Sequence, residues 1–128
     1  MKATYVYIVL TALIIGGLIL LRNNSGTTEN TTSSLYDTFA QCLNDAGAKF
    51  YGAYWCPHCQ AQKKLFQNSK NLPYIECSTP NGQGQLPLCT EAGITGYPTW
   101  TFTDGSLLNG EQTLETLATK TNCALPSL

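Results

Sequence analysis

A Cys-Pro-His-Cys segment, residues 56–59, constrains this chain more than any other feature of its sequence. It directly follows a short aromatic run, Lys49 to Trp55, whose composition predicts a buried strand. Pro57 suits the first turn of a helix, and the segment Gln60 to Gln67 is rich in helix-forming residues. The two cysteines are therefore expected where a strand meets a helix, with Cys56 at the helix N-terminus.

This position predicts thiol chemistry. Unpaired backbone N–H groups and the helix dipole favour the thiolate of Cys56, which is the nucleophilic form of the side chain. Cys59 lies three residues further on the same helical face, so it can form a disulfide with Cys56 without backbone movement. Pro57 fixes φ at the helix entry. His58, the only histidine of the chain, is expected to place positive charge beside the Cys56 sulfur and to stabilise the reduced form.

The N-terminal segment predicts a membrane anchor. Residues 4–21 carry no charge, and eighteen helical residues rising about 1.5 Å each would span about 27 Å, close to a hydrocarbon core of roughly 30 Å. Residues 1–21 are therefore expected to form a single-pass signal-anchor helix. The alternative, a cleaved signal peptide, needs small residues after the apolar run, where Leu20-Leu21-Arg22-Asn23 stands instead. Lys2 before the helix weakly favours a cytoplasmic N-terminus and an extracytoplasmic domain.

Residues 22–34 are polar and predict a flexible linker, which leaves residues 35–128 as the folded domain. A formal charge of −1 gives no electrostatic reason to expect nucleic-acid binding. Ser34 is the expected N-cap of the first helix, and Asp104-Gly105 predicts a two-residue hairpin turn. Apolar spacing and turn residues together predict the order α-β-α-β-α-β-β-α, a mixed sheet with helices on both faces.

The motif and its surroundings resemble known families. Residues 51–59 look like a thioredoxin-fold active site with the Cys-Pro-His-Cys sequence of DsbA-type oxidases. A longer match, over most of residues 47–120, is similar to the thioredoxin-like domain fused to bacterial vitamin K epoxide reductase homologues. This resemblance implies a thioredoxin-like α/β fold and a domain that passes electrons from substrate thiols to a membrane quinone-reducing partner. The fused reductase helices are absent from the sequence, so the partner's identity stays open.

The resemblance also places Pro98 at the cis-proline position of thioredoxin folds. Tyr97 would then present its backbone to an extended substrate, and Tyr97 and Trp55 are the expected substrate contacts. A trans-proline that merely ends a loop is the alternative. The buried acid of thioredoxins would fall near Phe50, where no carboxylate stands, so water or backbone is expected to assist proton transfer from Cys59.

Four further cysteines complete the set. The resemblance implies a Cys77–Cys89 disulfide beside the active site, either as a structural staple or as a relay pair that exchanges with the motif. Cys42 and Cys123 would tie the ends of the domain together, although six cysteines allow fifteen pairings. A zinc site built from the motif cysteines with Cys77 and Cys89 has the wrong spacing in its second pair, so no metal is expected.

These observations predict an enzyme: a membrane-anchored, extracytoplasmic thiol–disulfide oxidoreductase that exchanges disulfides with exported proteins through Cys56 and Cys59. This redox-active disulfide would be its only redox group, without a separate cofactor, and a membrane quinone-linked thiol oxidase would reoxidise it. Two alternatives stay open. One is a tethered thioredoxin-like reductant, and the other is a non-enzymatic adaptor that binds extended peptides and uses its cysteines structurally.

Overall fold

The computed structural model describes residues 31–126. The expected anchor, residues 1–21, and most of the expected linker lie outside this range. Within the described part of the chain, no helix is long and apolar enough to cross a membrane. The elements follow one another in the expected order: α2 (Thr31–Asp45), β1 (Lys49–Gly52), α3 (Pro57–Leu65), β2 (Tyr74–Glu76), α4 (Pro87–Glu91), β3 (Thr99–Thr101), β4 (Leu107–Asn109) and α5 (Leu114–Thr121).

The four strands form one mixed sheet in the order β2-β1-β3-β4. β1 pairs with β2 in parallel and with β3 antiparallel, while β3 and β4 form an antiparallel hairpin. β1 is an inner strand of this sheet, and three of its four residues are buried. The strand ends at Gly52 rather than at Trp55 as predicted, and Tyr54 and Trp55 are about half exposed in the turn before α3. The chain therefore has a mixed α/β fold with a four-stranded sheet, which is compatible with the expected thioredoxin-like fold.

Alternation along β1 divides the core between the two faces of the sheet. Phe50 points to the larger cluster, where its ring stacks on Trp100 of β3 with centroids 4.9 Å apart, and residues of α2 and α5 complete this cluster. Tyr51 points to the other face and packs in a smaller cluster with the Cys77–Cys89 disulfide and Ile94. Helices therefore cover both faces, with α4 on the side of Tyr51.

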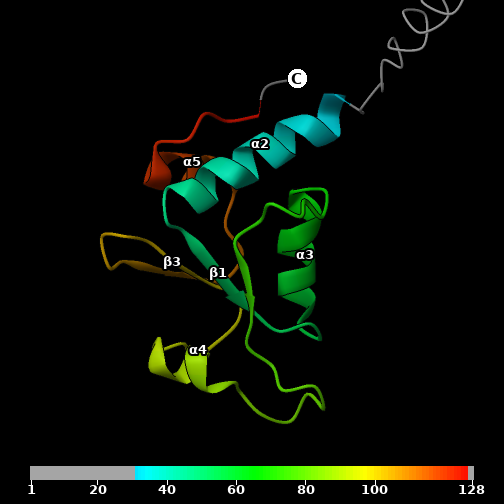
Figure 1. The fold of residues 1–128 in the computed structure, drawn as a ribbon, viewed down its shortest axis with the longest axis vertical. Coiled ribbons are helices and arrows are strands. Elements are labelled where there is room, and N and C mark those ends of the chain that lie inside the picture. Colours follow the sequence, from blue (N-terminus) through cyan, green and yellow to red (C-terminus); the bar gives the residue numbers. More distant parts are fainter. Residues whose placement is uncertain (1–30, 127–128) are drawn as a thin grey trace, which may run out of the picture.

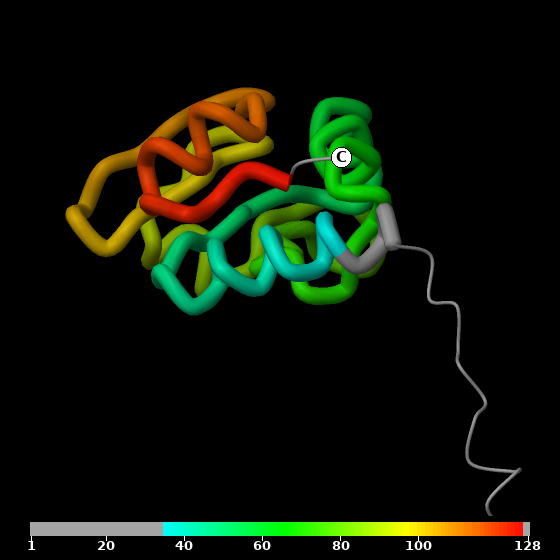
Figure 2. The backbone as a smooth tube through the Cα atoms, turned by 90° about the horizontal axis from the view of Figure 1, so that it is seen from above, coloured from blue at the N-terminus to red at the C-terminus, as the bar shows by residue number. Residues whose placement is uncertain are grey.

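The two ends of the sheet carry different structures. Figure 1 shows α2 across the end where β1 begins, while α4 lies at the end where β1 leads into the motif. A disulfide joins Cys42 of α2 to Cys123 just after α5, with 81 residues of separation and Cα atoms 6.0 Å apart. In Figure 2 the chain after α5 runs close to α2, so this bond ties the first and last helices of the domain together.

Two further local expectations were wrong. Helix α2 begins at Thr31 rather than at Ser34, since Ser and Thr differ from good helix formers by only a fraction of a kcal/mol per residue. The Asp104-Gly105 turn is also one residue longer than expected. The Phe102 N–H bonds the Ser106 carbonyl, and only Gly105 has a positive φ, +79°, whereas a two-residue type I′ turn needs two such residues.

Candidate active site at the start of helix α3

The motif lies at the junction of a strand and a helix. Cys56 is the N-cap residue of α3, with extended φ and ψ of −77° and 118°, and Pro57 is the first helical residue. The Cys56 N–H donates to the Ala53 carbonyl at 3.0 Å, which closes the turn between β1 and α3. Both motif cysteines are free thiols. The local sequence thus sets Cys56 at a helix N-terminus with Cys59 one turn further on.

Cys59 lies deeper than Cys56. It is 0% exposed, and its sulfur packs so closely over Gly52 that a Cβ on this glycine would lie 2.9 Å from the sulfur and 2.8 Å from the Tyr74 ring. Burial raises the pKa of the Cys59 thiol from 9.0 to about 12, and a hydrogen bond with Cys56 adds to the shift. Cys56 is 5% exposed. The pair therefore combines an outer thiol with an inner thiol that keeps its proton at neutral pH.

The loop before β3 faces the outer thiol. The Tyr97–Pro98 peptide bond is cis, and the Cys56 thiol donates a weak hydrogen bond to the Tyr97 carbonyl with a sulfur-to-oxygen distance of 3.8 Å. Pro98 itself is buried. Residues 41 positions apart thus meet at the sulfur, and the bond before Pro98 is cis, as the resemblance implied.

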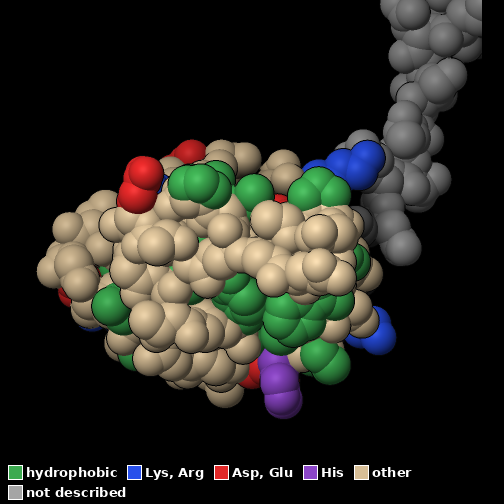
Figure 3. Space-filling model, turned by 90° about the horizontal axis from the view of Figure 1, so that it is seen from below, with side chains coloured by type: hydrophobic (Ala, Val, Ile, Leu, Met, Phe, Trp, Pro, Cys, Tyr) green, Lys and Arg blue, Asp and Glu red, His purple; other side chains and the backbone are tan. Residues whose placement is uncertain are grey.

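An aromatic rim flanks Cys56 on the side of α4. Trp55 is 49% exposed, lies edge-on to Tyr97, and donates from its indole nitrogen to Ser78 Oγ at 2.8 Å. The Cys77–Cys89 disulfide, with both residues fully buried, closes the loop that carries Ser78. Figure 3 shows an apolar surface at this end of the molecule, next to the protruding His58. Trp55 and Tyr97 therefore border the outer thiol together.

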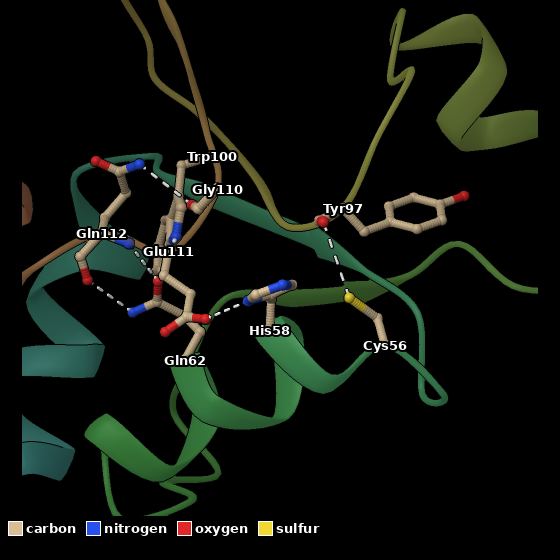
Figure 4. A network of polar contacts seen from close by, with 8 residues as sticks. All are labelled: Cys56, His58, Gln62, Tyr97, Trp100, Gly110, Glu111 and Gln112. Carbon is tan, nitrogen blue, oxygen red and sulfur yellow. Dashed lines mark hydrogen bonds and ion pairs between the residues drawn. The ribbon is translucent and has the colours of Figure 1, made fainter.

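His58 is held on the opposite side of the motif. Its Nδ1 lies 2.5 Å from Glu111 Oε1, and no described contact joins the imidazole to the Cys56 sulfur. Figure 4 shows the ring directed toward Glu111 while the sulfur of Cys56 points to Tyr97. Sequence reasoning missed Glu111 because it lies in a loop 53 residues from His58, where no periodic pattern marks it.

The sheet carries a carboxylate at its motif end, on β2 rather than near Phe50 on β1. Glu76 of β2 stands opposite Gly52 and accepts hydrogen bonds from the Tyr54 and Ser78 N–H groups and from the Tyr74 hydroxyl. Burial and this carboxylate hold the pKa of Tyr74 far above its usual value. The register of the parallel strands brings Glu76 to the motif end of the sheet, and only strand pairing could have indicated it.

The zinc alternative combined the motif cysteines with Cys77 and Cys89 as ligands. Cys77 and Cys89 are bonded to each other, so they do not stand beside Cys56 and Cys59 as ligands. Within residues 31–126, no group of three or more His, Cys, Asp or Glu side chains could hold a metal ion.

Comparison with known proteins adds evidence from sequence similarity. No protein-family model matches the chain. Thiol-disulfide oxidoreductase LTO1 of Arabidopsis thaliana is 42% identical over 103 residues, which cover 75% of this chain and 27% of the relative. The chain thus spans about a quarter of the length of this curated relative. Its similarity to a thiol–disulfide oxidoreductase agrees with a site built on two adjacent free thiols.

Proposed function

We propose that this chain is a thiol–disulfide oxidoreductase with a thioredoxin-like fold, which exchanges disulfides with protein substrates through Cys56 and Cys59. One observation carries the proposal: two free thiols stand at the N-terminus of α3, the outer one facing the Tyr97 carbonyl beside a cis-proline. The similarity to a relative named thiol-disulfide oxidoreductase supports the same reaction class.

The reaction that fits the pair best is oxidation of a substrate dithiol. A substrate thiolate attacks the Cys56 sulfur of the Cys56–Cys59 disulfide, the bond between the two cysteines breaks, and Cys59 leaves and takes up a proton. A second substrate thiolate then attacks the substrate sulfur of the mixed disulfide, and Cys56 leaves as a thiolate. The substrate loses two electrons and the cysteine pair gains them.

The buried Cys59 favours this course over the reverse attack. With a pKa of about 12, only about one Cys59 in 10⁵ is a thiolate at pH 7. Since thiolates and not thiols attack disulfides, Cys59 resolves a mixed disulfide slowly. A second substrate thiol, when one is near, therefore has the advantage and completes the oxidation or isomerisation of the substrate.

The cellular setting is part of the proposal. We infer that residues 1–21 anchor the chain in a membrane with the domain on the extracytoplasmic side, as a single-pass protein. The two closed disulfides support an oxidising compartment, where such bonds persist. A quinone-linked membrane thiol oxidase, similar to vitamin K epoxide reductase homologues, would take the electrons. The cysteine pair is the proposed redox group, and no separate cofactor is part of the proposal.

Trapping tests the function directly. In the full chain, Cys59→Ser should accumulate mixed disulfides, because the Cys56 thiolate can still attack a disulfide of a substrate or of the recycling partner while no second thiol of the motif can release the captured protein. The trapped proteins would name substrates and the recycling partner. The matched control is the Cys56→Ser/Cys59→Ser double variant, which should trap nothing. Absence of mixed disulfides in Cys59→Ser, with Cys56 still open to alkylation, would contradict the exchange mechanism.

The reduction potential of the Cys56–Cys59 pair decides the direction of electron flow. A reduction potential nearer DsbA's, about −120 mV, supports an oxidant, whereas one nearer thioredoxin's, about −270 mV, supports the tethered reductant. Two assays separate both enzymes from the adaptor: oxidation of a reduced dithiol peptide for the oxidant, and reduction of insulin disulfides for the reductant. An enzyme loses its turnover in Cys56→Ser, whereas the weak activity of an adaptor does not change.

A further inference from the structure

The short segment Gly110 to Gln112, between β4 and α5, is anchored at both ends next to the motif. The Gly110 N–H donates to the Pro98 carbonyl at 2.8 Å, which ties the segment to the cis-proline loop. At the other end, the Gln112 N–H donates to Gln62 Oε1 at 2.7 Å, and Gln62 Nε2 donates to the Gln112 carbonyl at 3.0 Å. The segment therefore connects the two structures that flank Cys56.

Gln62 is a rigid anchor. Its side chain lies on α3 one turn after His58 and is 1% exposed. The Trp100 indole N–H also faces its Oε1 at 3.4 Å, so both acceptor positions and one of the two donors of this buried amide have partners within the protein. A buried amide with satisfied partners has one stable orientation. The residue between the two anchors, Glu111, is thereby held at a fixed place relative to α3.

Glu111 uses that place to bind His58. The two side chains come from positions 53 residues apart and meet with Oε1 and Nδ1 at 2.5 Å (Figure 4). An ordinary surface ion pair has two flexible partners and contributes little. Here the backbone on both sides of Glu111 is fixed, so less conformational entropy opposes the contact. The contact with Glu111 also fixes the Nδ1 atom of His58, which lies between the two motif cysteines in the sequence.

We propose that Glu111 is a positioning residue, which holds the His58 imidazole away from the Cys56 sulfur and offsets its positive charge. This inference rests on the proposed function, because it concerns the redox behaviour of Cys56 and Cys59. A positive charge near Cys56 stabilises the thiolate and hence the reduced pair, which makes the disulfide a stronger oxidant. By turning the ring aside and neutralising it, Glu111 makes the couple less oxidising than the motif alone would be.

The equilibrium with glutathione measures this effect. In that reaction two glutathione thiols are oxidised to one disulfide while the Cys56–Cys59 disulfide is reduced to two thiols. With the full chain at one fixed pH, Glu111→Ala should shift this equilibrium about two- to fivefold toward the reduced protein, because no carboxylate then holds and offsets the imidazole. The shift should vanish when the same change is made in a His58→Ala background.

The matched control is Glu115→Ala. Glu115 is an exposed glutamate in the first turn of α5, four residues further on, and its removal changes the net charge by the same amount. It should leave the equilibrium unchanged. A shift of equal size in Glu115→Ala, or a full shift of Glu111→Ala without His58, would mean that general charge acts on the couple and would overturn the proposal.

The ring itself offers a second measurement. The chain contains one histidine, so its imidazole nitrogens are identified in a ¹H–¹⁵N spectrum without further assignment. Bonding to Glu111 requires a proton on Nδ1, and Glu111→Ala should lose this signature while Glu115→Ala retains it. Identical spectra would overturn the proposal. Failure of the proposed function would be seen separately, as an absence of turnover and trapping, because the glutathione equilibrium needs no protein substrate.

Discussion

The two closed disulfides fasten opposite ends of the domain, and they differ in what they enclose. Cys42–Cys123 spans 81 residues and joins the first helix to the end of the last, whereas Cys77–Cys89 spans 12 residues beside the motif. The entropy of loop closure assigns about 4.5 kcal/mol to the longer loop and about 3 kcal/mol to the shorter one. The Cys42–Cys123 disulfide thus joins the first and last helices of the domain, whereas the Cys77–Cys89 disulfide closes a single loop.

The largest effect should follow from opening the long loop. Cys42→Ala/Cys123→Ala should lower the free energy of unfolding by about 4.5 kcal/mol, because the unfolded chain regains its freedom. Urea denaturation measures this loss. The rate of disulfide exchange at Cys56 in the folded variant should stay unchanged, since the bond lies at the other end of the sheet. A smaller loss than in the Cys77–Cys89 variant would reverse the comparison.

Opening the short loop should cost less stability and act nearer the site. Cys77→Ala/Cys89→Ala should lower the free energy of unfolding by about 3 kcal/mol, and the Ser78 loop should show faster amide hydrogen exchange. Both sulfurs are fully buried, which favours a staple over a relay pair. Turnover through Cys56 should therefore persist when an external oxidant is supplied. Loss of turnover in a folded variant would support the relay.

The third cysteine pair differs from both because it can titrate. The raised pKa of Cys59, about 12 against 9.0, means that the folded reduced protein holds this proton more tightly than the unfolded chain does. This contribution to stability is intact below pH 9 and is lost as the pH rises toward 12. By about pH 10.5 the reduced protein should lose about 2 kcal/mol relative to the oxidised one, in which Cys59 cannot titrate. If the free energies of unfolding of the reduced and the oxidised protein changed with pH in the same way, this prediction would be contradicted.

The smallest effect concerns the hydrogen bond between the short loop and the aromatic rim. Ser78→Ala removes the acceptor of the Trp55 indole N–H and should cost about 1 kcal/mol of stability. The exchange of that indole proton with water should also become faster. Ser106→Ala, in the β3–β4 turn, is the matched control and should leave the Trp55 proton unchanged. Equal exchange rates in both variants would show that the loop does not hold the rim.

Much of the fold was predictable because local signals agreed. The aromatic run before Cys56, Pro57 at the helix start and the turn residues gave the correct order of elements, since each signal acts within a few residues. Boundaries were less certain, as the start of α2 and the β3–β4 turn show. Asp-Gly suits both two- and three-residue turns, and the pairing of the flanking strands decides between them.

The site was predictable only where its residues belong to one local motif. Cys56 and Cys59 carry their own signal, whereas Glu111 and Gln62 act through contacts across about 50 residues. Glu76 stands opposite Gly52 only because β1 and β2 are parallel in that register. Side chains that depend on strand register or on loop anchoring leave no periodic trace in the sequence, and they need the structure to be found.

The small size of Gly52 influences the position and the ionisation of Cys59 without any charge. Because the Cys59 sulfur and the Tyr74 ring both lie within 3 Å of where its Cβ would stand, even alanine would force one of them to move. Outward movement of Cys59 would bring it toward water and ease its ionisation. Two relatives with identical motifs and identical charges could therefore differ in how long a captured substrate stays attached, through the volume of a single methyl group.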